Sequence, residues 1–175
     1  MSTPRAPELI RENLESNRPT GSTGEAKTDR PPATVDLHTA TSTGDRATVR
    51  LHLSRGAEPG AISEAGWAPL HLAAGSGDER MIQLLLGAGA RVDQPSCTGC
   101  TGVTPLHCAV AGGHLGVVRQ LLGAGACPDR RDDTGYTALH LAAERGDYPV
   151  VRALLLAGAT SRLPLSEDCA LTLAR

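Results

Sequence analysis

The cysteine pair Cys97-Thr98-Gly99-Cys100 has the spacing of half a zinc site or of a redox pair. A structural zinc site needs two further ligands, and no second C-x-x-C or H-x-x-x-H follows in the sequence. Cys127 and His114 are the remaining partners that the chain offers for such a site. Three interpretations therefore stay open: an exposed loop without a ligand, a metal site and a redox switch.

Motifs for other chemistry are absent from the sequence. It has no G-x-x-x-x-G-K-[ST], no H-E-x-x-H and no G-x-S-x-G. The glycine pairs Gly87-x-Gly89 and Gly123-x-Gly125 follow helical patterns and are not placed to cradle a phosphate. Nothing assembles a nucleophile with a base and an orienting group. We therefore predict a protein that is not an enzyme and that holds no cofactor.

The structural elements of the chain are clearest in the stretch from Thr104 to Ala126, TPLHCAVAGGHLGVVRQLLGAGA. It reads as a helix, a turn and a second helix. Thr104 is a good N-cap, and Pro105 suits the first helical turn, where its missing N–H costs nothing. The pair Gly112-Gly113 ends this helix, and a second amphipathic run continues to Gly125. Each helix is too short to be stable alone, so the unit needs neighbours.

Those neighbours are copies of the same unit. Leu-His pairs occur at Leu37-His38, Leu70-His71, Leu106-His107 and Leu139-His140, with offsets of 33, 36 and 33 residues. The four Gly-Ala pairs that begin at Gly56, Gly89, Gly125 and Gly158 repeat the same offsets. The offset of 36 comes from an insertion: Gly89 to Thr104 spans 15 positions, whereas Gly125 to Thr137 spans 12. The three extra residues fall within Pro95 to Gly102, in a loop.

A period of 33 with T-P-L-H at a helix start resembles the ankyrin repeat. The resemblance implies an all-α solenoid of helix-turn-helix repeats joined by β-hairpin loops. We expect a disordered arm over residues 1–34 and one repeat domain over residues 35–175. The repeats fall at about 35–60, 61–93, 94–129 and 130–162, and a partial capping repeat falls at 163–175.

In the ankyrin family the repeated histidine bonds to the threonine at the helix start and to neighbouring backbone. The resemblance therefore implies that His71, His107 and His140 are structural. The repeat spacing of roughly 10 Å also separates successive copies too widely to share a zinc ion, whose ligand bonds are about 2.1 Å. His52 replaces the leucine that the other repeats have at Leu85, Leu121 and Leu154. This fits a capping unit, with a contact or a pH-sensitive site as the alternative.

Partner-binding residues also follow from the resemblance, because ankyrin repeats bind proteins through hairpin tips and groove-facing helix starts. Trp67, Val103 and Tyr136 occupy equivalent hairpin positions, and aromatic residues dominate many interfaces. We predict that these three form a protein-binding ridge; the alternative is that each ring packs on its own hairpin. The other residues predicted to bind a partner are Glu64, Cys100, Thr101, Asp133, Thr134, Glu144 and Arg145.

The two ends of the chain allow alternatives. Residues 7–14, PELIRENL, are either part of a disordered leader or a short amphipathic helix that docks on a partner. Residues 166–174, SEDCALTLA, resemble a fifth repeat that is cut off after one helix. We expect this helix to close the stack; otherwise the last face stays open. An open face would allow self-association through Leu171 and Leu173.

Composition and charge narrow the classes of partner. The net charge is −2, with 17 basic and 19 acidic residues, which gives no electrostatic footprint for nucleic acid or an anionic membrane. The odd number of cysteines, five, suits a reducing compartment better than a disulfide framework. We predict a monomeric, cytoplasmic or nuclear protein that acts as an adaptor, scaffold or inhibitor subunit by binding another protein. A thiol- or zinc-dependent module and a self-associating structural protein are the alternatives.

Overall fold

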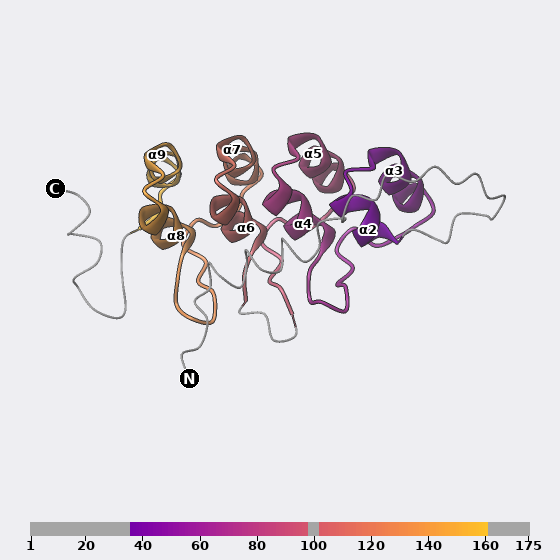
Figure 1. Ribbon diagram of the computed structural model, residues 1–175, viewed down its shortest axis with the longest axis horizontal. Helices are drawn as coiled ribbons and strands as arrows, with labels where there is room; N and C mark the ends of the chain where they lie inside the picture. The colour runs from indigo at the N-terminus through magenta and orange to yellow at the C-terminus, as the bar shows by residue number, and fades with distance from the viewer. Residues whose placement is uncertain (1–35, 98–101, 161–175) are drawn as a thin grey trace, which may run out of the picture.

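The computed structural model describes residues 36–97 and 102–160, and these residues form four helical pairs stacked in one row (Figure 1). The helices alternate between an inner layer, from which the connecting loops project, and an outer layer on the opposite side. The inner helices are α2 (Leu37–Ser42), α4 (Pro69–Ser76), α6 (Pro105–Gly112) and α8 (Ala138–Arg145). The outer helices are α3 (Arg46–Ser54), α5 (Glu79–Gly87), α7 (Leu115–Gly123) and α9 (Tyr148–Leu156). The expected all-α repeat solenoid is confirmed for this part of the chain.

Local sequence sets the bounds of the helices. Thr104 is extended, with φ −99° and ψ 164°, and α6 begins at the next residue, Pro105, as predicted. Gly113 ends α6 in the left-handed region at φ 75°, where a residue with a Cβ atom would be strained. Asp45, Asp78 and Asp147 cap the outer helices α3, α5 and α9 by accepting hydrogen bonds from backbone N–H groups of the first turn.

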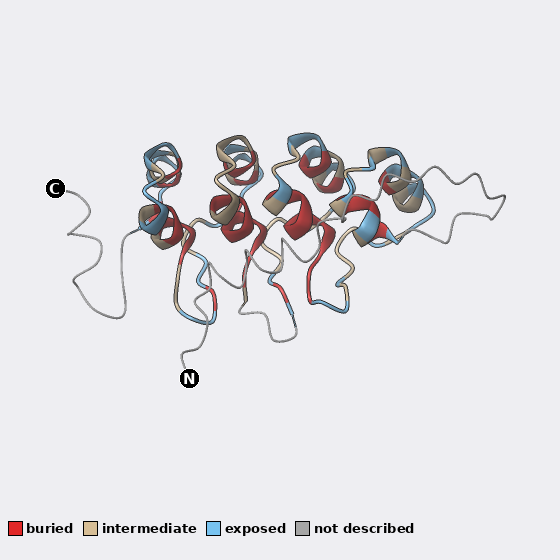
Figure 2. Ribbon diagram, viewed as in Figure 1, coloured by how far each residue is buried: buried red, intermediate tan, exposed pale blue. Residues whose placement is uncertain are grey.

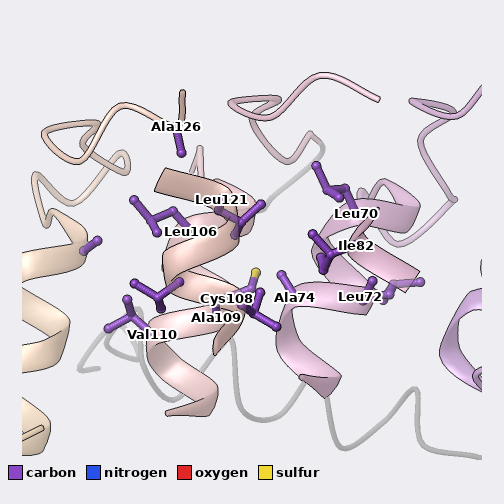
Figure 3. Packing of buried hydrophobic residues seen from close by; sticks show 14 of the residues in the cluster. Leu70, Leu72, Ala74, Ile82, Leu106, Cys108, Ala109, Val110, Leu121 and Ala126 are labelled. Carbon is purple, nitrogen blue, oxygen red and sulfur yellow. The ribbon is translucent and has the colours of Figure 1, made fainter. Parts of the chain in front are cut away.

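The core lies between the two layers and between successive pairs, as the buried faces in Figure 2 show. Leu70 and Ile82 of one repeat and Leu106 and Leu121 of the next are each at most 1% exposed. Figure 3 shows these side chains at the interface of two neighbouring pairs, with Cys108 among them. Cys108 is fully buried, so this thiol belongs to the core. Because each pair packs on its neighbours in sequence, the stack has one continuous core.

The loops between repeats close as hairpins with equivalent hydrogen bonds. Ser63 N donates to Trp67 O at 2.9 Å, and Asp132 N donates to Tyr136 O at 2.9 Å. In the loop with the insertion, Ser96 N donates to Val103 O at 2.8 Å. The two residues of each hydrogen bond are four positions apart in the first two loops and seven positions apart in the loop with the insertion. The three extra residues therefore lie between Ser96 and Val103. The predicted N-terminal arm and the predicted capping repeat at 163–175 lie outside the described residues.

Candidate functional site

Two histidines at the third position of inner helices, His71 of α4 and His107 of α6, join one repeat to the next. His71 Nδ1 accepts a hydrogen bond from Ala68 N at 3.2 Å, and its Nε2 lies 3.0 Å from Val103 O in the following hairpin. Since Nδ1 is the acceptor, Nε2 carries the proton and donates. His107 repeats this arrangement, with Thr104 N at 3.2 Å from Nδ1 and Tyr136 O at 3.3 Å from Nε2. Thr104 Oγ1 also lies 2.8 Å from His107 Nδ1.

Burial keeps these two rings neutral. It lowers the pKa of His71 to about 4, against the hydrogen bonds to backbone carbonyls, which favour the charged ring. Burial also lowers the pKa of His107, although the nearby Asp132 carboxylate acts in the opposite direction. With both ring nitrogens engaged in each case, neither histidine offers a lone pair to a metal ion or a substrate. The structural role implied by the resemblance is therefore seen in the geometry.

His140 differs from the other two at one ring nitrogen. Its Nδ1 accepts from Thr137 N at 3.0 Å and lies 3.0 Å from Thr137 Oγ1, as in the earlier repeats. Its Nε2 is buried and has no hydrogen-bond partner among the described residues. Partial burial also lowers the pKa of His140, and Arg131 adds to this effect. The last described repeat therefore presents a ring donor without the acceptor that its equivalents have in the next hairpin.

The predicted binding ridge of Trp67, Val103 and Tyr136 does not form an exposed surface. Trp67 is 3% exposed and Val103 is 1% exposed, so neither side chain reaches the surface. The Trp67 ring packs edge-on against His71, with ring centroids 5.4 Å apart. Tyr136 is half-buried and packs in the same way on His140 at 5.8 Å. The alternative was that each ring packs on its own hairpin, but each ring instead packs on a histidine of the inner helix that follows its hairpin, α4 for Trp67 and α8 for Tyr136.

Other residues predicted to bind a partner do lie on the surface of the hairpins and inner helices. We call this set the inner surface; its members are all exposed: Glu64, Asp133, Thr134, Glu144 and Arg145. Arg145 also reaches the previous repeat, because its guanidinium donates to Ala111 O at 2.7 Å. Cys100 and Thr101 lie outside the described residues, so their predicted role and the Cys97–Cys100 zinc hypothesis stay predictions.

A cavity of roughly 410 Å³ lies at the N-terminal end of the inner surface. Glu64, which was predicted to bind a partner, lines it together with Asp36 and Ile62, which sequence reasoning missed. Hydrogen bonds from Thr39 lower the pKa of Asp36, so its carboxylate is charged at neutral pH. His38 forms the wall between α2 and the hairpin, since its Nε2 lies 2.8 Å from Ala61 O. The sequence signal for this cavity was an isoleucine, Ile62, within a predicted hairpin loop; the structure shows that its side chain is exposed.

A larger cavity of roughly 830 Å³ lies on the opposite side of the stack, between α7 and α9. We call it the outer groove, and the residues that define it are Arg119, Leu122 and Gly123 of α7 and Tyr148, Arg152 and Leu156 of α9. Tyr148 is 74% exposed. None of these six residues was among the predicted sites.

Comparison with known protein families gives one result. A family profile described as ankyrin repeats (3 copies) matches residues 37–132 and residues 93–163, which together cover more than half of the chain. The search of curated protein sequences gave no match. Among the described helices, none has the length and apolar character needed to cross a bilayer. Within residues 36–97 and 102–160, no three metal-binding side chains come together.

Proposed function

Because the chain belongs to the ankyrin repeat family, whose members generally mediate protein–protein interaction, we propose that it binds another protein through the inner surface. In this proposal it acts as an adaptor, scaffold or inhibitor subunit, without catalysis, in the cytoplasm or the nucleus. The observation that carries the proposal is the exposure of Glu64, Asp133, Thr134 and Glu144 on hairpins and inner helices.

The hydrogen bonds at the repeat junctions support this role. His71 and His107 each fix the start of an inner helix to the next hairpin, so the hairpins hold a defined spacing. A surface that is ordered before binding loses less conformational entropy when a partner docks. The exposed residues of the inner surface therefore stand on a pre-organised support.

Charge distinguishes the two ends of the inner surface and favours a partner with a basic or polar side chain at one of them. The cavity near α2 has two carboxylates, Asp36 and Glu64, beside the exposed Ile62. An arginine or lysine of the partner would place its aliphatic stem on Ile62 and its charge near these carboxylates. Repeat four adds charges of both signs, Asp133, Glu144 and Arg145, which affect specificity and association rate more than affinity.

The test uses charge reversal on the inner surface, since replacing the buried Trp67 would damage the core. The full-length wild type, a Glu64→Lys, Glu144→Lys double variant and an Arg50→Gln control on outer helix α3 would each be used to capture proteins from a cell lysate. Circular dichroism and urea unfolding would first establish equal folding. We expect a protein that wild type and the control retain and the double variant loses. Identical captured sets for all three would contradict the proposal.

A further inference from the structure

One row of solvent-facing residues on helix α9 is more apolar than the equivalent row on the other outer helices. Tyr148, Arg152 and Leu156 are four residues apart and so share one face of α9. Tyr148 is 74% exposed and Leu156 is 79% exposed. The equivalent triplets of the earlier outer helices are Arg46, Arg50 and Ser54; Glu79, Gln83 and Gly87; and Leu115, Arg119 and Gly123. Among these four rows, that of α9 alone has large apolar residues at both ends.

These apolar side chains line a groove and are not scattered singly on the surface. The outer groove has Leu122 of α7 in its lining, and it faces Tyr148 and Leu156 of α9. The groove is open beside Gly123 of α7: a Cβ atom built on this glycine would have no neighbouring atom within 4 Å. A larger side chain at this position would project into that open space. Tyr148 and Leu156 are eight residues apart in one helix, which corresponds to about 12 Å along its axis. A groove with apolar residues at this spacing fits two turns of a partner helix.

The charged residues of the outer groove are both arginines. Arg119 and Arg152 occupy equivalent positions in adjacent outer helices and both are exposed. Neighbouring packed helices lie about 8–10 Å apart, so the two guanidinium groups can flank an occupant from either side. No carboxylate is among the residues that line the groove. An occupant with acidic residues on both sides of an apolar stripe would complement this surface in charge as well as in shape.

We propose that the outer groove binds an acidic amphipathic helix of a partner protein. The apolar stripe of that helix rests on Leu122, Tyr148 and Leu156, and its carboxylates pair with Arg119 and Arg152. This site lies on the side of the stack opposite to the inner surface, so an occupant here leaves the inner surface accessible. A protein helix suits the groove better than an anionic membrane does, because the apolar residues line a channel between two helices and only two cations flank it.

The test measures binding of a defined peptide to the full-length protein. The probe is a fluorescein-labelled 16-residue synthetic helix with leucines along one face and glutamates on both flanks, and the matched peptide has lysine at every glutamate. Fluorescence anisotropy gives the dissociation constants. We expect the acidic peptide to bind and the lysine peptide not to bind, with affinity falling as salt concentration rises.

The repeats themselves supply matched variants. Leu156→Ser introduces the residue of repeat one, Ser54, and Arg152→Gln introduces the residue of repeat two, Gln83. We expect Leu156→Ser to weaken binding about tenfold, because it removes an exposed leucine that the bound peptide would cover. Arg152→Gln should weaken binding about three- to fivefold, as for a partly exposed ion pair. The controls Leu51→Ser and Arg50→Gln change exposed residues of α3 and should leave the dissociation constant unchanged.

The two tyrosines of the chain report where the peptide binds. Tyr148 lies in the outer groove, and Tyr136 lies in a hairpin beside His140. With ¹³C-labelled tyrosine, the acidic peptide should shift the ring signals of Tyr148 and leave those of Tyr136 in place. Shifts at Tyr136 without shifts at Tyr148 would overturn the proposal, and so would equal binding of the lysine peptide.

Other occupants of the groove give distinct results, and each would overturn the proposal. Vesicles with phosphatidylserine that bind wild type but not the Leu156→Ser variant, without binding of the acidic peptide, would assign the groove to a membrane surface. Concentration-dependent dimerisation lost in the same variant would assign it to a second copy. Peptide binding that appears only after Glu167→Ser and Asp168→Ser would assign it to the chain's own acidic segment. Charge reversal at Glu64 and Glu144 leaves the groove intact, so this proposal and the proposed function fail separately.

Discussion

The junction between repeats three and four is more completely packed and hydrogen-bonded than the outward face of repeat four, although the two have similar residues. We use outward face for the side of repeat four on which a following repeat would pack; His140, Val151 and Leu155 lie there. At the junction, His107 Nε2 reaches Tyr136 O, and Val118 of α7 is fully buried. On the outward face, His140 Nε2 has no described partner, and the equivalent valine, Val151, is partly exposed. Leu155 is 52% exposed there. The comparison teaches that the sequence of a repeat provides half of each junction, and the following repeat completes it.

The backbone after repeat four is nevertheless held by the same kind of hydrogen bond as the backbone after repeat three. Cys127 N donates to the Asp93 carboxylate at 3.1 Å, and Thr160 N donates to the Asp129 carboxylate at 2.7 Å. Cys127 and Thr160 are equivalent residues, each directly after a Gly-Ala pair. Four predictions test how far the two regions differ in stability.

The largest difference is expected between core leucines and leucines on the outward face. Leu121→Ala, at a fully buried position, should lower the free energy of unfolding by about 2–5 kcal/mol, because it leaves a cavity. Leu155→Ala should lower it by less than about 1 kcal/mol, because about half of that side chain already contacts solvent. Urea unfolding measures both, and equal losses would contradict the distinction between the two regions.

The histidines should show a smaller difference of the same kind. His107→Ala removes a ring that bonds on both sides and leaves Thr104 N–H and Tyr136 C=O without it, which should cost about 2–3 kcal/mol. His140→Ala removes one side only and should cost about 1 kcal/mol. Thermal unfolding compares the two variants. A cost at His140 that matches the cost at His107 would mean that residues beyond Thr160 complete its second bond.

Acid should weaken the interior junctions through the same histidines. An unfolded histidine has a pKa near 6.5, whereas burial lowers the pKa of folded His71 to about 4. Between these values the unfolded chain binds more protons, so the free energy of unfolding falls as pH falls, by up to about 1.4 kcal/mol per pH unit. The loss begins near pH 6.5 and levels off below about pH 4. His71→Gln should make the slope shallower; an NMR titration with His71 protonating near pH 6.5 would refute this.

The smallest effect is expected from removing residues 161–175. If these residues close the stack, as the sequence predicts, they cover part of Val151 and Leu155, which is worth about 1 kcal/mol. Deletion should lower the midpoint of urea unfolding by a corresponding amount and leave the circular dichroism of the described helices nearly unchanged. An unchanged midpoint would show that the outward face of repeat four is open in the full chain.

The sequence predicts local features well because they depend on few residues. Thr104 and Pro105 set the start of α6, and Gly113 sets its end, through backbone conformations that these residue types favour. The repeat offsets predict the stacking, since equal units pack in equal ways. The burial of Trp67 and Val103 was not predictable in this way. It depends on how each hairpin packs against the preceding repeat as well as its own: His71 Nε2 lies 3.0 Å from Val103 O, 32 residues away. The outer groove likewise requires the relative position of α7 and α9.

The insertion in the third hairpin has a practical consequence. Ser96 and Val103 close the base of this loop with two hydrogen bonds, Ser96 N to Val103 O at 2.8 Å and Val103 N to Ser96 Oγ at 3.0 Å. The repeats on both sides keep their register despite the added length. Extra sequence between residues 97 and 102 therefore costs little beyond loop closure, which grows slowly with length. This hairpin is the natural place to graft an epitope, a reporter or a foreign binding loop without rebuilding the domain.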